Sequence, residues 1–135
     1  MLPPEDPRVA DTVQLVRERL WCQTSVGGLA RYEGDAYYRA AGDTPGNPWF
    51  VTTLWYAQYV TSKARSMDEL APVVRILEWT AAHALPSGVL AEQLDPRTGE
   101  PLSVSPLTWS HAAFVTAVCE YRQKRQELLA ARRRR

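Results

Sequence analysis

Glu92 is the residue of this sequence best placed for proton-transfer chemistry. It lies in a stretch from residue 85 to 105 whose turn dipeptides, such as Asp95-Pro96, predict a structured loop rather than a helix or a central strand. Apolar residues flank Glu92, and the amide of Gln93 follows it, so neighbours can hold the carboxylate and aim it at a substrate. The alternative is a solvated loop glutamate, which is the common state of this residue type.

A second candidate pair, Arg31 and Asp35, lies in a glycine-rich segment from residue 23 to 47. Arginine offers a rigid fork of donors that suits adjacent hydroxyl groups. Asp35 could accept a hydrogen bond from such a hydroxyl or orient the arginine. An ordinary surface ion pair is the alternative for these two residues.

The aromatic residues favour a sugar ligand. The sequence has five Trp and six Tyr but only two Phe, so most of its large rings carry a polar group. A flat apolar face combined with a donor suits a pyranose ring, although the same residues also suit cores and interfaces. His111 could line such a site beside Trp109, but a place in the core or behind the site residues is the interpretation that we favour.

Other chemistries find little support in the sequence. Cys22 and Cys119 are far apart and form no zinc-ligand pattern, so we expect two free thiols, no metal and no cofactor. A net charge of +1 gives no overall attraction to nucleic acid or to an anionic membrane, and we expect neither as a partner. The start of the sequence lacks the features of a signal peptide, which predicts a cytoplasmic location.

Hydrophobic periodicity and breaker residues predict four helices separated by two long loops. The first should run from about Pro7 to Trp21, and the second from Pro48 to about Val60. The body of the second helix is apolar on nearly every side, which predicts burial all round. A third helix is expected from about Met67 to Ala84, with Ser66 as its N-cap and Pro72 in its first turns.

The fourth helix should begin at Pro106 or Thr108 and continue to about Leu129. We expect residues 126–135 to form a frayed, basic tail.

Two long motifs occur in a fixed order. The first is Gly28-Leu29-Ala30-Arg31-Tyr32-Glu33-Gly34-Asp35-Ala36-Tyr37-Tyr38, followed by Gly46-Asn47-Pro48-Trp49-Phe50. The second runs from Ala91-Glu92-Gln93 through Gly99-Glu100 and Leu102-Ser103 to Leu107-Thr108-Trp109-Ser110-His111. Together they resemble the glucoamylase family, glycoside hydrolase family 15, over nearly the whole chain.

The resemblance implies an all-α fold, the (α/α)6 toroid of six-hairpin glycosidases. In that fold, loops at one end of the barrel form the active-site funnel. Residues 1–135 would supply the C-terminal part of the catalytic domain, about the last third of the barrel. We therefore expect the two long loops to meet on one side, so that Arg31, Trp49, Glu92 and Trp109 line one concavity.

The resemblance also implies inverting hydrolysis of terminal α-glucosidic bonds, which needs an acid and a base. Glu92 matches the general base of the family. Gln93 and Ser103 would support it, with Ser103 as a hydrogen-bond partner of the charged carboxylate. The residues implied in substrate binding are Arg31, Tyr32, Asp35, Tyr37, Trp49 and Trp109.

The sequence departs from the family pattern in one respect, because nothing before Glu92 reproduces the acidic unit that supplies the general acid. We therefore expect the chain to be inactive alone. It should depend on a missing N-terminal portion of the barrel, or self-associate through exposed apolar faces. The alternative is a non-catalytic carbohydrate-binding or degenerate helical module. A nucleic-acid-binding protein is a third, less favoured class.

Overall fold

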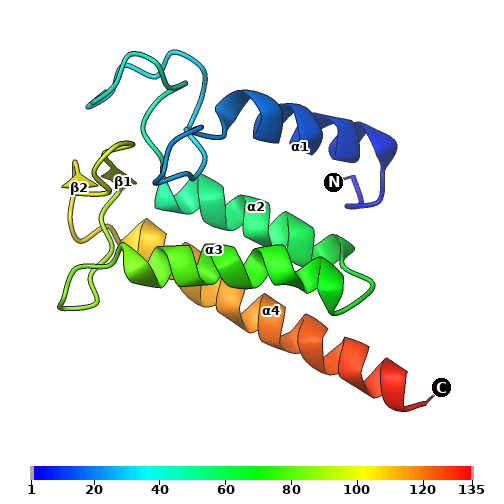
Figure 1. The fold of residues 1–135 in the computed structure, drawn as a ribbon. Coiled ribbons are helices and arrows are strands. Elements are labelled where there is room, and N and C mark those ends of the chain that lie inside the picture. Colours follow the sequence, from blue (N-terminus) through cyan, green and yellow to red (C-terminus); the bar gives the residue numbers. More distant parts are fainter. Residues whose placement is uncertain (1, 135) are drawn as a thin grey trace.

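The computed structural model describes residues 2–134 as a bundle of helices with loops gathered at one end (Figure 1). The α-helices are α1 (Pro7–Leu20), α2 (Phe50–Lys63), α3 (Ala71–Ala82) and α4 (Thr108–Arg133). A 3-10 turn, η1 (Asp68–Leu70), precedes α3, and two short strands, β1 (Gln93–Leu94) and β2 (Pro101–Leu102), pair antiparallel. The fold is all-α, as the sequence predicts. In the described part of the chain, no helix is both long and apolar enough to span a membrane.

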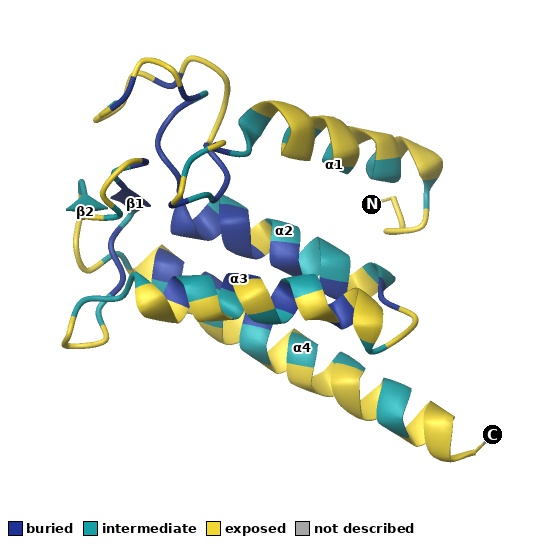
Figure 2. Cartoon of the chain, in the orientation of Figure 1, coloured by how far each residue is buried: buried dark blue, intermediate teal, exposed yellow. Residues whose placement is uncertain are grey.

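Helix α1 lies on the outside of the bundle. The Asp6 side chain accepts a hydrogen bond from the backbone N–H of Arg8 at 2.9 Å, and Pro7 occupies the first helical position. None of the residues of α1 is buried, and in Figure 2 the helix is exposed or intermediate along its length. It ends at Leu20, one residue before the expected end, and Trp21 then packs edge-on against Tyr56 of α2.

Helix α2 is the centre of the bundle and packs against both α3 and α4. Its buried residues include Phe50, Leu54 and Ala57. Burial is not complete, however, because the side of α2 that carries Trp55 is uncovered and that residue is 47% exposed. The expectation of burial on every side was wrong at this position.

The helix also begins at Phe50 rather than at Pro48. The carbonyl of Pro48 accepts from the N–H of Leu94, and the N–H of Trp49 donates to the carbonyl of Leu29. These two residues are thereby held in an extended conformation and cannot enter the helix.

The third helical segment is divided into η1 and α3, whereas we expected one continuous helix. Proline has no N–H, and its ring collides with the carbonyl four residues earlier, so Pro72 prevents an α-helical turn over residues 68–72. The hydroxyl of Ser66 accepts from the N–H of Glu69 at 3.2 Å, but Ser66 is not the N-cap that we expected, because Met67 occupies that position for η1 and Leu70 for α3. His83 ends α3, with its Nδ1 2.8 Å from the carbonyl oxygen of Trp79.

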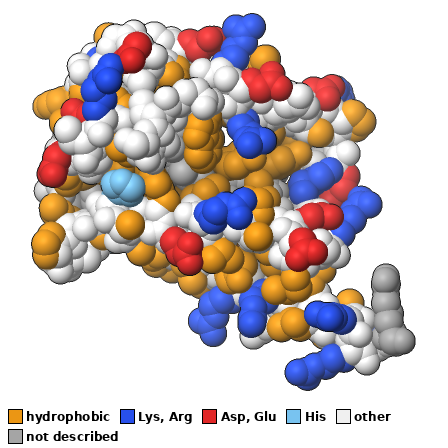
Figure 3. All heavy atoms as spheres, in the orientation of Figure 1, with side chains coloured by type: hydrophobic (Ala, Val, Ile, Leu, Met, Phe, Trp, Pro, Cys, Tyr) orange, Lys and Arg blue, Asp and Glu red, His pale blue; other side chains and the backbone are white. Residues whose placement is uncertain are grey.

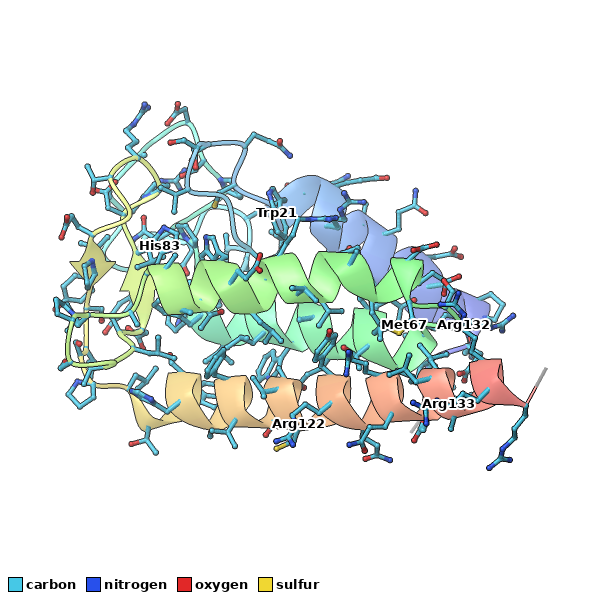
Figure 4. All side chains as sticks on the ribbon, turned by 60° about the horizontal axis from the view of Figure 1, so that its bottom comes forward. Trp21, Met67, His83, Arg122, Arg132 and Arg133 are labelled. Atoms are coloured by element: carbon cyan, nitrogen blue, oxygen red, sulfur yellow. The ribbon has the colours of Figure 1, made fainter. Side chains whose placement is uncertain are left out.

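Helix α4 is longer than expected and continues to Arg133. The tail that we expected to be frayed is therefore helical over residues 126–133. Leucine, alanine and arginine are strong helix formers, and cations near a helix C-terminus interact favourably with the helix dipole. Figure 4 shows Arg132 and Arg133 at the end of α4 that lies away from the loops.

The two long loops are joined by a ladder of backbone bridges at one end of the bundle. Single-residue antiparallel bridges connect Trp21 with Leu29, Leu29 with Trp49, and Trp49 with Gln93. The pairing of Gln93 with Leu102 then extends the ladder to β2. Segments 23–47 and 85–105 therefore meet on one side, as the sequence analysis predicted.

Thr53 connects this ladder to α2. Its hydroxyl donates to the carbonyl of Trp49 at 2.6 Å and accepts from the N–H of Leu29 at 2.9 Å, and the residue is buried. A buried N–H group without a partner carries the full cost of losing its water.

We predict that Thr53→Val lowers the free energy of unfolding by about 1–3 kcal/mol, because valine keeps the shape but leaves the Leu29 N–H unpaired. Urea denaturation of the full chain measures this. The matched control is Thr116→Val on α4, where the exposed hydroxyl bonds only to the Ala112 carbonyl, and we expect a change within about 0.5 kcal/mol. Equal effects of the two substitutions would contradict this role for Thr53.

Candidate functional site

The main chain around Glu92 is fixed by hydrogen bonds on both sides. The N–H of Glu92 donates to the carbonyl of Val104 at 2.9 Å, and its carbonyl accepts from the N–H of Phe50 at 3.4 Å. Leu90 and Ala91, which precede it, are buried in the core. The position of the Glu92 backbone is therefore set by α2 and by the loop that follows β2.

The carboxylate of Glu92 is half-buried and accepts two hydrogen bonds. Ser103 Oγ lies 2.5 Å from Glu92 Oε2, and Gln93 Nε2 lies 3.3 Å from the same oxygen. The hydroxyl of Tyr37 is 3.3 Å from Ser103 Oγ, which connects the two loops through their side chains. The structure thus contains the contact between Glu92 and Ser103 that was predicted, and the two donors fix the orientation of the carboxylate.

Ser103 adopts a left-handed backbone conformation, with φ at 63°. This region is unusual for a residue other than glycine, and such residues are enriched at functional sites. The geometry directs the serine hydroxyl toward Glu92.

Arg31 forms the second centre of the site. Its guanidinium carbon lies 4.5 Å from the ring centre of Trp49, 4.9 Å from that of Tyr32 and 5.4 Å from that of Tyr37. Cation–π contacts of this kind fix the plane of the guanidinium group. The Arg31 side chain remains 37% exposed, so it can reach a ligand from this position.

Asp35 fixes the orientation of the Arg31 guanidinium. Its two carboxylate oxygens each lie 2.9 Å from a guanidinium nitrogen, and the Asp35 side chain is buried. Burial raises the pKa of Asp35, but hydrogen bonds from Arg31 and from the N–H of Tyr37 outweigh this, so the pKa lies below its usual value. Of the two roles considered for Asp35, the structure shows the orientation of the arginine.

A buried pair of amides joins the two centres, and the sequence analysis assigned no role to one of its members. Asn47 Nδ2 donates to Gln93 Oε1 at 2.9 Å and to the carbonyl of Tyr38 at 2.7 Å, and Asn47 Oδ1 accepts from the N–H of Ala40. Since Gln93 also contacts Glu92, Asn47 ties the loop of Arg31 to the carboxylate. The position of Asn47 in the Gly-Asn-Pro-Trp-Phe motif was the feature of the sequence that could have indicated this role.

Trp49 and Trp109 differ in their surroundings. Trp49 is buried beneath Arg31, and its indole N–H finds no acceptor among the described residues. Trp109 is 53% exposed and packs edge-on against Trp55, and no hydrogen bond or ring contact found in residues 2–134 joins it to Arg31 or Glu92. The structure therefore brings together every predicted site residue except Trp109, and the single concavity stays a prediction.

Thiol and metal chemistry find no support at this site. Burial raises the pKa of the Cys22 thiol to about 11, and Cys22 Sγ contacts the carbonyl of Gly46, so this group is an unreactive packing residue. Within the described chain, no three His, Cys, Asp or Glu side chains gather closely enough to hold a metal ion. The groups of this site available for chemistry are the Glu92 carboxylate, the partly exposed Arg31 guanidinium and aromatic faces, since the Asp35 carboxylate is buried and bound to Arg31.

Comparison with known proteins connects this arrangement to a family. Residues 60–119 match the model of the glycosyl hydrolases of family 15, a span that includes Glu92, Ser103 and Trp109. An uncharacterized glycosyl hydrolase of Methanocaldococcus jannaschii is 29% identical over 86% of this chain. A trehalase of Mycobacterium tuberculosis is 28% identical over 87% of it.

The chain is much shorter than these relatives, since the matches cover only 19% and 16% of their lengths. A crystal structure of a bacterial glucoamylase complexed with acarbose superimposes on 90% of this chain with a TM-score of 0.75, at 22% identity and over 18% of its own length. This likeness shows that the helices and loops have the arrangement found in part of an (α/α)6 toroid. The motifs, the relatives and the fold agree: residues 60–119 match the family 15 model, and the chain as a whole is similar to part of longer glycosyl hydrolases.

Proposed function

We propose that this chain supplies the general base and part of the sugar-binding surface of a glucoamylase-type hydrolase. The reaction is the inverting hydrolysis of a terminal α-glucosidic bond, in which a base activates water while an acid protonates the leaving oxygen. Relatives named trehalase and glucoamylase lead us to α-glucosides as the substrate class.

The observation that carries this proposal is the contact chain from Glu92 to Arg31. Ser103 holds Glu92, Tyr37 reaches Ser103, and the ring of Tyr37 lies beside the Arg31 guanidinium. A carboxylate held in one orientation thus shares a surface with a donor suited to sugar hydroxyls.

In this proposal the general acid comes from a portion of the enzyme outside these 135 residues. An inverting pair stands roughly 6.5–9.5 Å apart, with room for water between the carboxyl groups. Glu33, the acidic residue nearest Arg31 in sequence, is exposed, and its carboxylate pairs with Arg19 at 3.4 Å rather than with a residue of the site.

Two apolar surfaces of the chain favour the binding of a partner that completes the barrel. A groove of about 840 Å³ lies between α1 and the pair α2 and α3, lined in part by Val13, Trp21, Tyr56, Ile76 and Trp79. Figure 3 shows hydrophobic atoms gathered in this region between charged side chains. On α2 and α4, Trp55, Trp109 and Val115 are each 47–60% exposed. Apolar faces of this kind suit further helices of the barrel, or a second copy when those helices are absent.

We predict that the isolated 135-residue chain releases no measurable β-glucose from maltooligosaccharides, because a missing acid alone removes about 10²- to 10⁴-fold of rate. It should also self-associate in light scattering. Fusing the chain behind the portion of a family 15 enzyme that it does not match should restore both activity and a single defined species. Hydrolysis by the isolated chain at rates typical of an enzyme would show that it already contains an acid.

In such a fusion, we expect Glu92→Gln to lower kcat by about 10²- to 10⁴-fold with little change in KM. The amide keeps the shape of the side chain but loses its basicity. The comparison variant is Trp109→Ala, which should raise KM through lost contact area. Wild-type turnover of Glu92→Gln would remove Glu92 from the mechanism, whereas sugar binding without turnover in the parent fusion would favour the non-catalytic binding module.

We further predict that Asp35→Asn lowers the free energy of unfolding by about 1–3 kcal/mol at pH 7. Because the pKa of Asp35 is lowered in the folded state, its contribution is present above the ordinary aspartate pKa, about 3.9, and is lost as the pH falls through the lower folded-state value. The effect of the substitution should therefore shrink in acid, as measured by denaturation at several pH values.

The matched control is Asp43→Asn, which removes an exposed ion pair with Arg97 at 2.8 Å. Exposed pairs contribute little, so we expect a change below about 1 kcal/mol. An Asp35→Asn effect that is as small as this control, or that is the same at pH 3 and pH 7, would contradict the role assigned to Asp35.

A further inference from the structure

His111 contacts the main chain just before Glu92, although no part of the proposed chemistry uses it. The backbone N–H of Leu90 donates to His111 Nε2 at 3.0 Å. His111 lies in the first turn of α4 and is half-buried, and Leu90 is 3% exposed. The contact therefore crosses from α4 to the segment that carries the candidate base.

The direction of this hydrogen bond defines the state of the imidazole ring. A backbone N–H can only donate, so Nε2 must offer a lone pair and carry no proton. A neutral ring with an unprotonated Nε2 has its proton on Nδ1. A protonated imidazolium has two donors and no acceptor, and it would leave the Leu90 N–H without its partner.

The start of α4 makes two further contacts with the same segment. Ser110 Oγ donates to the carbonyl of Ala91 at 2.7 Å, and the N–H of Leu107 donates to the carbonyl of Leu90 at 3.0 Å. Three bonds thus hold the two residues that precede Glu92. Of these three bonds, only the one to His111 is accepted by a side chain that a proton can convert into a donor.

Few charged groups surround His111. Residues 101–119, which include its own part of α4 and β2, contain no Asp, Glu, Lys or Arg. In the segment 85–91 there is none either, and α2 has none before Lys63. The nearest elements carry Glu92, which is bonded to Ser103, and three charged or titratable residues of α3 and its C-cap: Arg75, Glu78 and His83.

We propose that neutral His111 is a positioning residue, which fixes the main chain leading to Glu92 by accepting the Leu90 N–H, and that protonation of Nε2 releases this segment. The contact stands on geometry alone, while its consequence for catalysis rests on the function proposed for Glu92. The bond to the Leu90 N–H would accordingly be present only while the ring is uncharged, and the two remaining bonds would then hold the segment less tightly.

The first test is the ring state of His111 in the full chain labelled with ¹⁵N-histidine. The sequence has two histidines, so His83→Gln identifies the signals of His111. At pH 8 we expect the neutral Nδ1–H tautomer. A proton on Nε2 at that pH would overturn the proposal, because Nε2 could not accept from Leu90.

The second test follows hydrogen exchange of the Leu90 amide. We expect His111→Leu to speed exchange by about tenfold or more at pH 8, because the amide loses its acceptor. His111→Gln, which offers a side-chain oxygen at a similar distance, should restore most of the protection. It should also remove the change in the exchange of this amide, relative to its intrinsic rate, that the wild type shows between pH 8 and pH 5.

His83→Gln is the matched control and should leave the Leu90 amide unaffected. Leu90 exchange that is unchanged in His111→Leu would overturn the proposal. If His111→Leu loses protection throughout the chain, the ring state of the wild type and the pH dependence of His111→Gln decide, since both report on folded protein. Neither measurement needs turnover. A negative result in these tests would therefore not contradict the role proposed for Glu92, and a Glu92 that proves not to be the base would not contradict the contact between His111 and Leu90.

Discussion

The arrangement of the site depends on the pairing of backbone groups at the ends of the helices. Leu29, Trp49 and Gln93 belong to loops that are buried there, and their N–H and carbonyl groups must find partners away from water. They find them in one another, through single-residue bridges rather than through a full sheet. Because Trp49 bridges to both neighbours, the segment of Arg31 and the segment of Glu92 are positioned on one frame.

The same frame explains why charged groups are accommodated in a small structure. Asp35 is buried, and it stays ionised because Arg31 and a backbone N–H bind both of its oxygens. Arg31 in turn lies against aromatic rings while its outer edge faces solvent. Recognition of a polar ligand requires a donor that is held rigidly and is also accessible, and Arg31 meets both conditions.

The helices support the loops, but they pack against one another on one side only. Helix α2 packs against α3 and α4, while α1 buries none of its residues and a groove separates it from α3. The match covers only 18% of the glucoamylase structure, so most of the helices of that structure have no counterpart among these residues. The loops are well supported, because they rest on the packed side.

Periodicity, proline and turn residues in the sequence by themselves determined the four helices, the two loops and the motifs that carry Arg31 and Glu92, because these are properties of neighbouring residues. Helix lengths were less well determined: Pro72 divided the third helix and the last helix continued to Arg133. Only the tertiary structure decided the link from Asn47 to Gln93, which lie 46 positions apart, and the contact of His111 with Leu90. Such contacts depend on how elements distant in the chain pack together, and no local pattern records that.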